Sequence, residues 1–307
     1  MELVKGFVGY LVLLVSVLIS VAFVTLLEQK VLAGAQIRVG PNYVGYMGLL
    51  QPFADAVKLF SKESMSLRSV NKIIYYVSPM ISLGLVLFLW SLMPYLSGGI
   101  SFGLGIFFFV CVSGLGVYPI LSSGWSSNSK YSVLGSLRAV AQMISYEVSL
   151  ITVLLSVVWF MGSFNLEDIV MGQKGLVNIY LFMPLGVIWL VSALAETNRT
   201  PYDFSEGESE LVSGFNTEYS SGGFTLIFMA EYASILFMSF FFVILFLGGV
   251  MGLIMMMKMM IISVWFIWVR ATLPRYRYDK LMYLAWKSFL PISLLFFIMY
   301  LSFGFCG

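Results

Sequence analysis

The sequence contains no histidine and only two cysteines in 307 residues. The absence of imidazole excludes histidine-ligated haem, zinc–histidine sites and acid–base catalysis by histidine. Cys111 and Cys306 lie in separate apolar runs, without the spacing of a metal site or a disulfide framework. If this chain takes part in redox chemistry, another subunit must therefore carry the cofactor.

Charged residues are scarce as well. They make up 10% of the chain, against 60% hydrophobic residues, whereas soluble domains contain about a quarter charged residues. A chain this apolar would expose large hydrophobic patches to water, so lipid must be its solvent. Residues 1–307 are predicted to form a single transmembrane domain. The apolar run from Gly6 shows no cleavage-site pattern, so it is expected to be a first span rather than a signal peptide.

Eight apolar segments approach the length of about 20 residues that a helix needs to cross a bilayer. The predicted fold class is therefore an all-α bundle of eight transmembrane helices. The seventh segment contains Lys258, whose side chain we expect to extend toward the nearer membrane surface. The predicted spans are residues 6–27, 73–94, 103–122, 139–161, 177–195, 224–247, 251–269 and 289–305.

The basic residues are distributed unevenly when the loops are assigned to alternate sides. One side receives 14 of the 17 lysines and arginines, and the other receives only Lys5, Lys174 and Lys258. By the positive-inside rule the basic side faces the cytoplasm or the mitochondrial matrix. An even number of spans then places both termini on the opposite side.

Three loops on the basic side are longer than a helical hairpin requires, namely residues 28–72, 196–223 and 270–287. In the first loop, apolar residues recur at helical spacing against polar ones. This pattern predicts a short amphipathic helix that lies at the membrane interface or against a partner. The apolar residues are Leu49, Leu50, Phe53, Val57 and Phe60.

The second long loop is strongly acidic, with Arg199 as its single base. Thr200 and Pro201 have the preferences of an N-cap and a first helical position, so a short helix is predicted from Pro201. Acids packed on one helix face resist simultaneous ionisation, which raises their pKa values toward neutral pH. The alternative is a solvated acidic loop. The acids are Glu196, Asp203, Glu206, Glu208, Glu210 and Glu218.

Two further acids, Glu147 and Glu231, lie inside predicted spans. An ionised carboxylate at the bilayer centre costs roughly 2.5–3.5 kcal/mol on insertion scales, and such residues usually have a function. The alternative is that each is a hydrogen-bonded residue of helix packing. The third long loop contains a basic cluster, for which a simple interpretation is an anchor that binds anionic lipid. That cluster is Arg270, Arg275, Arg277 and Lys280.

Six longer motifs lie in these loops and spans: QIRVGPN (36–42), GLLQPFADAVK (48–58), RAVAQMISYE (138–147), AETNRTPYD (195–203), EGESEL (206–211) and FMAEY (228–232). Together they resemble the chain 1 family of mitochondrial NADH–ubiquinone oxidoreductases, from the first span to the eighth. That family is the membrane subunit beside the quinone site of the proton-pumping respiratory complex I.

The resemblance implies a subunit of a proton-translocating NADH–ubiquinone reductase that has no redox cofactor of its own. Ubiquinone is the implied substrate, and FMN and iron–sulfur clusters are carried by partner subunits. The implied location is the mitochondrial inner membrane, with both termini toward the intermembrane space. The implied partners are peripheral-arm subunits on the matrix face, neighbouring membrane-arm subunits and phospholipids, and no nucleic acid is expected.

The family roles also imply site residues, though neither a catalytic residue nor a metal site in this chain. Arg38, Asp55, Phe228 and Arg270 correspond to the tunnel that holds the isoprenoid tail of the quinone. One departure is Gln29, which stands where the family commonly has arginine, so an arginine at the tunnel mouth is missing. The implied acidic proton path consists of Glu147, Glu196, Asp203, Glu206, Glu208 and Glu231, with Arg199 as a local counter-charge.

Two other functions compete with this one. A stand-alone proton-coupled transporter typically has internal repeats or broken helices around a polar site at the midplane, whereas the acids here gather near one surface. A structural anchor for a hydrophilic arm explains the long loops, but it leaves Glu147 and Glu231 without a role.

Overall fold

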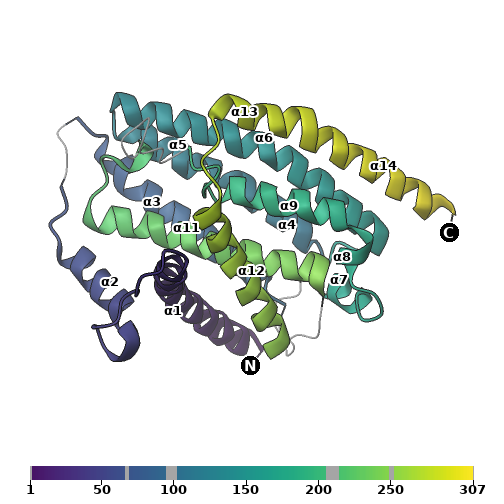
Figure 1. The fold of residues 1–307 in the computed structure, drawn as a ribbon, viewed down its shortest axis with the longest axis horizontal. Coiled ribbons are helices and arrows are strands. Elements are labelled where there is room, and N and C mark those ends of the chain that lie inside the picture. The colour runs from purple at the N-terminus through teal and green to yellow at the C-terminus, as the bar shows by residue number, and fades with distance from the viewer. Residues whose placement is uncertain (1, 66–68, 95–101, 205–213, 249–251, 307) are drawn as a thin grey trace.

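The computed structural model describes residues 2–65, 69–94, 102–204, 214–248 and 252–306. Within these ranges every regular element is a helix, which confirms the predicted all-α membrane fold (Figure 1). Seven described helical segments are long and apolar enough to cross a bilayer. They are Gly6–Ala35, Lys72–Leu92, Gly105–Ser126, Lys130–Met161, Ser221–Leu247, Leu253–Thr272 and Tyr278–Phe303.

The fifth predicted span, residues 177–195, is broken into two pieces. The single turn α8 (Asn178–Leu181) is followed by α9 (Met183–Glu196), which has a proline in its first turn. The 14 residues of α9 extend about 21 Å at 1.5 Å per residue, which is less than the roughly 30 Å of a hydrocarbon core. Helix α9 packs against α6 (Lys130–Met161) and α11 (Ser221–Phe242), and α8 and α9 together extend over almost the whole predicted span, so the eight-helix arrangement is retained.

Two helices begin earlier in the sequence, at the basic side, than the predicted spans do. Helix α6 starts at Lys130 rather than residue 139, and the Ser129 side chain accepts a hydrogen bond from the Ser132 N–H at its start. The last span starts with α13 (Tyr278–Tyr283), passes through a π-helical turn (Leu284–Phe289) and continues as α14 (Leu290–Cys306), instead of starting at residue 289. Charged residues in these first turns lowered the local hydropathy, yet a helix tolerates them where it extends beyond the bilayer.

The predicted amphipathic helix in the first long loop is confirmed as α2 (Gln51–Ser61). It packs beside α1 (Glu2–Ala35) and α11 at one side of the bundle. Phe53 contacts Phe23 of α1 edge to face, with ring centroids 6.0 Å apart. The side chains of Val57 and Phe60 remain exposed, as expected of a helix that lies in the interface or against a partner.

Helix α11 lies at the centre of the bundle (Figure 1) and most of its side chains are buried. Aromatic rings from neighbouring helices pack against it. Phe241 stacks on Phe109 of α4 (Gly105–Leu115) at 4.2 Å, and Trp90, which follows α3 (Lys72–Leu89), lies 5.7 Å from Phe240. Because lipid is as apolar as these rings, close van der Waals packing rather than the hydrophobic effect holds the helices together.

Polar side chains hold the far end of α11, where it continues as a π-helical turn (Val243–Leu247). Gln173, which follows α7 (Leu166–Gly172), donates to the Ile244 and Leu245 carbonyls, and Asn178 also donates to Leu245. The Lys258 ammonium of α12 (Leu253–Thr272) donates to the Leu247 and Gly248 carbonyls at 2.9 and 2.8 Å. Lys258 therefore caps the end of α11.

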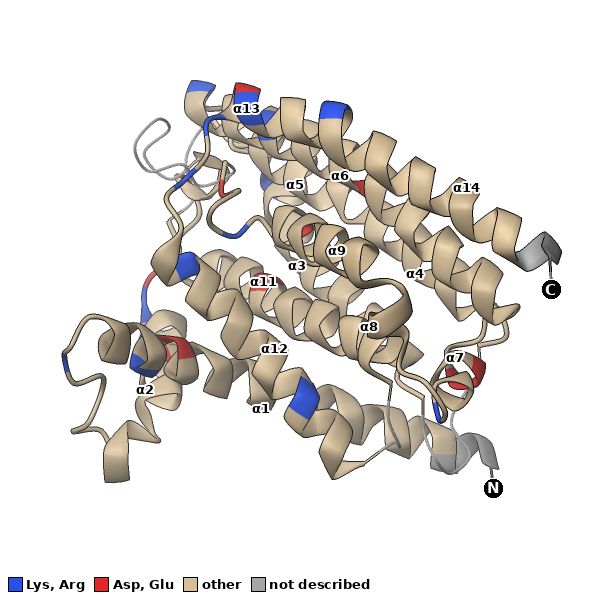
Figure 2. Ribbon diagram, turned by 45° about the vertical axis from the view of Figure 1, so that its right-hand side comes forward, with Lys and Arg blue, Asp and Glu red and all other residues tan. Residues whose placement is uncertain are grey.

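The two ends of the bundle differ in their content of basic residues. Figure 2 shows most lysines and arginines around α2, α13 and the loops beside them, while both chain ends lie at the other end. We refer to the end with α2 and α13 as the basic face. It also carries α5 (Val117–Ser126) and the loop that joins it to α6.

Candidate functional site

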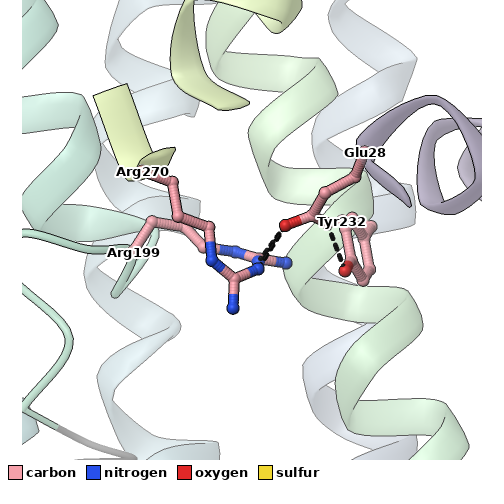
Figure 3. A network of polar contacts seen from close by, with 4 residues as sticks. All are labelled: Glu28, Arg199, Tyr232 and Arg270. Carbon is pink, nitrogen blue, oxygen red and sulfur yellow. Dashed lines mark hydrogen bonds and ion pairs between the residues drawn. The ribbon is translucent and has the colours of Figure 1, made fainter. Parts of the chain in front are cut away.

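Glu28 is a buried carboxylate near the basic end of α1, with 5% of its surface exposed. It accepts hydrogen bonds from the Tyr232 hydroxyl of α11 and from Arg270 of α12. Arg199, just after α9, places its Nη1 3.4 Å from Glu28 Oε1. Figure 3 shows the four side chains converging from these elements. We call Glu28, Arg199, Tyr232 and Arg270 the Glu28 cluster.

The Glu28 cluster holds two guanidinium groups against one carboxylate. Burial would otherwise make the charge of Glu28 costly, and two cations and a hydroxyl compensate it. The Arg199 guanidinium also lies over the Tyr232 ring, 4.4 Å from its centroid. Burial opposes the charge of Arg199, but Tyr232, Glu28 and Glu231 outweigh burial, so the pKa of Arg199 lies above its ordinary value. The cluster therefore carries an excess positive charge.

Two donors of Arg199, Nε and Nη2, are buried and have no hydrogen-bond partner among the residues that the structure describes. A small cavity of about 10 Å³ adjoins the cluster, with apolar walls that include Val24, Ile235 and Phe266. This volume admits about one water molecule, so a quinone does not fit inside this chain at that point. A larger ligand would have to lie against the outer side of the cluster, where the Arg270 side chain is 40% exposed.

A larger cavity of about 120 Å³ lies against another face of α11. Two carboxylates line it, Glu231 of α11 and Glu196 at the end of α9, together with serine hydroxyls from α3, α5 and α11. The serines include Ser78, Ser123 and Ser234. The rest of the wall is mostly apolar, with side chains such as Leu85, Val112 and Phe237, and a volume of this size accommodates several water molecules beside the polar groups. We call it the acid cavity.

Glu147 of α6 extends this series of acids. It lies against Gly114 of α4, where a Cβ atom would come within 2.9 Å of Glu147 Oε1. The glycine thus leaves room for the carboxylate. Glu147 is close enough to Glu196 to interact with it electrostatically, and Glu231 interacts in the same way with Arg199. The three acids therefore lie in the same part of the bundle: Glu231 and Glu196 line the acid cavity, Glu231 is near the Glu28 cluster, and Glu147 is near Glu196.

The segment after Arg199 is folded into the bundle rather than solvated. Asp203 is buried and pairs with Arg275, whose Nη2 lies 3.0 Å from Asp203 Oδ2. Tyr202 is also buried and stacks on Tyr276, with centroids 5.6 Å apart. Burial and the neighbouring Tyr276 raise the pKa of Tyr202 to about 12, so its hydroxyl stays neutral at physiological pH.

Residues 201–204, the described part of the helix predicted from Pro201, are not helical. Residues 200–204 make a turn, with the Tyr202 N–H donating to the Arg199 carbonyl at 2.8 Å. Gln142 Nε2 donates to the Tyr202 carbonyl at 2.8 Å, and the Tyr276 N–H donates to the Pro201 carbonyl at 3.1 Å. These bonds use carbonyls that a helix would pair internally, so tertiary contacts override the local start signal. The predicted path acids Glu206 and Glu208 lie outside the described residues, as does Glu210.

The predicted tunnel residues are distributed over four places. Arg270 belongs to the Glu28 cluster. Arg38 is exposed in the loop after α1, where its N–H donates to the Ala33 carbonyl. Asp55 of α2 accepts a hydrogen bond from Gln51 at 2.9 Å, and Phe228 of α11 packs against Phe224 at 4.3 Å.

Sequence reasoning missed two members of the cluster, Glu28 and Tyr232. The available signal was position: Glu28 is the first acid after the uncharged run that begins at Gly6. Its neighbour Gln29, which stands where the family commonly has arginine, is exposed, whereas Glu28 is buried. The substitution at Gln29 therefore leaves the Glu28 cluster intact.

Comparison with known proteins identifies the family of this chain. The model of the NADH dehydrogenase family matches residues 8–301. NADH-ubiquinone oxidoreductase chain 1 of Aedes aegypti is 59% identical over 295 residues, which cover 96% of this chain and 94% of the relative. The proteins of the same name from Locusta migratoria and Monodelphis domestica are 55% and 48% identical, each over 96% of this chain and 95% of the relative. The chain therefore belongs to the NADH dehydrogenase family, among the proteins named NADH-ubiquinone oxidoreductase chain 1.

Proposed function

We propose that this chain is the membrane subunit of a proton-translocating NADH–ubiquinone oxidoreductase, forming one wall of the quinone tunnel and part of the proton path. The names of its relatives support the enzyme assignment. In this proposal FMN and iron–sulfur clusters belong to partner subunits. The chain resides in the mitochondrial inner membrane, with the basic face toward the matrix and both termini toward the intermembrane space.

The observation that carries the proposal is the position of Arg199 between two acids. It pairs with Glu28 on one side and interacts with Glu231, a wall residue of the acid cavity, on the other. A change of charge near the Glu28 cluster therefore alters the electrostatic potential in the acid cavity through a single side chain, that of Arg199. Because burial lowers the local dielectric, such an interaction is stronger than it would be in water.

Reduction of ubiquinone to ubiquinol takes up two electrons and two protons, and the electrons come from a partner subunit. The quinone lies between this chain and its partner, since the cavity at the Glu28 cluster is too small to hold it. Arg270, with its partly exposed side chain, faces the quinone. Arg38, Asp55 and Phe228 line the tunnel at other depths.

Negative charge that develops on the quinone attracts the guanidinium groups of Arg270 and Arg199 and weakens their ion pairs with Glu28. Arg199 then stabilises Glu231 less, and the proton affinity of the acid cavity changes. Glu231, Glu196 and Glu147 pass protons along the cavity, with the water it admits between them. Asp203, Glu206 and Glu208 extend this path at the basic face, where Arg275 balances Asp203.

The basic face is also the docking surface for peripheral-arm subunits. The loop between α1 and α2 exposes large apolar side chains there, among them Ile37, Tyr43 and Tyr46. Exposed apolar residues outside the lipid-facing spans indicate a protein partner. Neighbouring membrane-arm subunits and phospholipids cover the outward faces of the spans.

Extraction in mild detergent separates this function from that of a stand-alone transporter. The proposal predicts migration in a large assembly with flavin and iron–sulfur signals. Migration as a free chain contradicts it.

Neutralisation of Glu147 tests the acid path within that assembly. Glu147→Gln should lower the number of protons translocated per NADH more than it lowers quinone affinity. Asp168→Asn, an exposed acid of α7 far from the acid cavity, is the matched control. An unchanged stoichiometry in Glu147→Gln contradicts the proposed path.

A further inference from the structure

Gln142 is a fully buried glutamine of α6 that faces the end of α9. Its Nε2 donates two hydrogen bonds, one to the Ala195 carbonyl and one to the Tyr202 carbonyl, both at 2.8 Å. Its Oε1 is buried, and no described residue donates to it. Turned the other way, the amide would place Oε1 against two carbonyl oxygens, which cannot donate. The two donated bonds therefore fix the orientation of the side chain.

The two carbonyls that accept these bonds have a special place in the chain. Ala195 directly precedes Glu196, and Tyr202 directly precedes Asp203. A carbonyl shares one planar peptide unit with the N–H of the next residue, so each bond fixes the backbone from which a proposed path acid extends. Arg199 lies in the segment between them. A single amide of α6 thus holds both ends of this segment.

Helix α6 also carries the third acid of this group. Glu147 follows Gln142 by five residues in α6, which is about 7.5 Å along the helix axis. Regular helical backbone therefore connects the amide to Glu147, which interacts electrostatically with Glu196. The bonds of Gln142 tie the segment that carries Glu196 and Asp203 to the helix that carries Glu147.

We propose that Gln142 is a positioning residue of the proton path, which fixes Glu196 and Asp203 relative to Glu147. This role rests on the proposed function of the acids as a proton path. An amide does not titrate, so Gln142 acts through the carboxylates that it positions. Transfer between such groups depends steeply on geometry, and a displacement of about 1 Å can cost up to 100-fold in rate.

The test uses the whole complex in proteoliposomes with Gln142→Met, which keeps the length of the side chain and removes both donated bonds. The rate of NADH-driven proton translocation should fall at least severalfold, because the acids are displaced from one another. The solvent isotope effect on that rate should rise, because proton transfer becomes limiting. The KM for quinone should stay at the wild-type value, since Arg270, which faces the quinone in the proposed mechanism, is outside the segment.

Gln173→Met is the matched control. Gln173 is also a buried glutamine whose Nε2 donates to two backbone carbonyls, and its Oε1 likewise lacks a donor within the described part of the chain. Its bonds go to the far end of α11, which Asn178 and Lys258 still hold in the variant. Gln173→Met therefore loses as many hydrogen bonds as Gln142→Met, and it should keep the wild-type translocation rate and isotope effect.

A wild-type translocation rate in assembled Gln142→Met overturns the proposal. Equal losses in Gln142→Met and Gln173→Met without a rise in the isotope effect also overturn it, because they indicate a packing role. If Gln142→Met does not assemble, Gln142→Asn decides, since it keeps a polar amide but is too short to reach both carbonyls. A lower rate with a raised isotope effect then supports positioning, and a wild-type rate contradicts it. Failure of both variants to assemble assigns Gln142 a structural role and overturns the proposal.

Glu196→Gln separates this inference from the proposed function. A loss of translocation in Glu196→Gln, together with a wild-type rate in Gln142→Met, leaves the acid path in place and removes the role of Gln142. Wild-type translocation in Glu196→Gln contradicts the acid path itself, and with it the role of Gln142.

Discussion

Arg199 lies 3.4 Å from Glu28, although 171 residues separate them in the chain. The pair joins the end of α1 to the loop after α9, and Tyr232 and Arg270 complete the junction from α11 and α12. This junction lies beside the acid cavity and fixes the relative positions of four chain segments. The junction therefore stabilises the packing of these segments. In the proposed mechanism it also connects the quinone site to the acid cavity.

Replacement of Arg199 should be strongly destabilising. Arg199→Gln leaves a buried carboxylate with one cation fewer, and breaking a buried ion pair from one side costs about 3–5 kcal/mol. We expect a lower yield of assembled complex and a lower midpoint of thermal unfolding. Arg277→Gln removes an exposed ion pair with Asp279 and should have little effect. Equal stability of the two variants would show that the Glu28 cluster does not hold the helices together.

Tyr232→Phe tests the contribution of one hydroxyl to the same cluster. The variant keeps the ring beneath Arg199 and loses the hydrogen bond to Glu28. A hydrogen bond to a charged group contributes about 1.5–3 kcal/mol, so the midpoint of thermal unfolding should fall by less than in Arg199→Gln. Tyr180→Phe, at a tyrosine that is 78% exposed, serves as the control and should match wild type.

The sequence predicted the bundle better than it predicted the site. Long uncharged runs identify spans such as α1, and helical spacing of apolar residues identifies α2, because both signals are local. The break before α9 and the turn after Pro201 depend on tertiary contacts, for example the hydrogen bonds from Gln142. Glu28, Arg199, Tyr232 and Arg270 meet only after folding, so spacing along one sequence could not reveal that Glu28 belongs to the site.

Gly114→Ala should displace the Glu147 carboxylate without removing it. The new Cβ would lie 2.9 Å from Glu147 Oε1, closer than two such atoms can approach. Since displacements of about 1 Å in a reacting group can cost up to 100-fold in rate, we expect at least a severalfold loss of proton translocation. In Gly84→Ala the added Cβ meets nothing within 4 Å, so normal pumping is expected there. Normal pumping in Gly114→Ala as well would argue against a role for the position of Glu147.

Lys258→Met should loosen the far end of α11. The variant keeps the length of the side chain and loses the two hydrogen bonds to the Leu247 and Gly248 carbonyls. Local opening of the helix end then becomes easier, and amide hydrogen exchange in residues 243–248 should accelerate. Lys174→Met changes an exposed lysine on the same side of the membrane and should leave the exchange unchanged. Unaltered exchange in Lys258→Met would mean that Gln173 and Asn178 suffice to hold α11.

The proton path through the acid cavity is tested most directly by the number of protons translocated per NADH in the Glu231→Gln complex. Glu231 lines the acid cavity and interacts with Arg199, so its neutralisation interrupts the link between the Glu28 cluster and Glu196. The account predicts a clear fall in this ratio, with normal quinone affinity and an intact assembly. A ratio equal to that of wild type, measured in fully assembled complex, would contradict it.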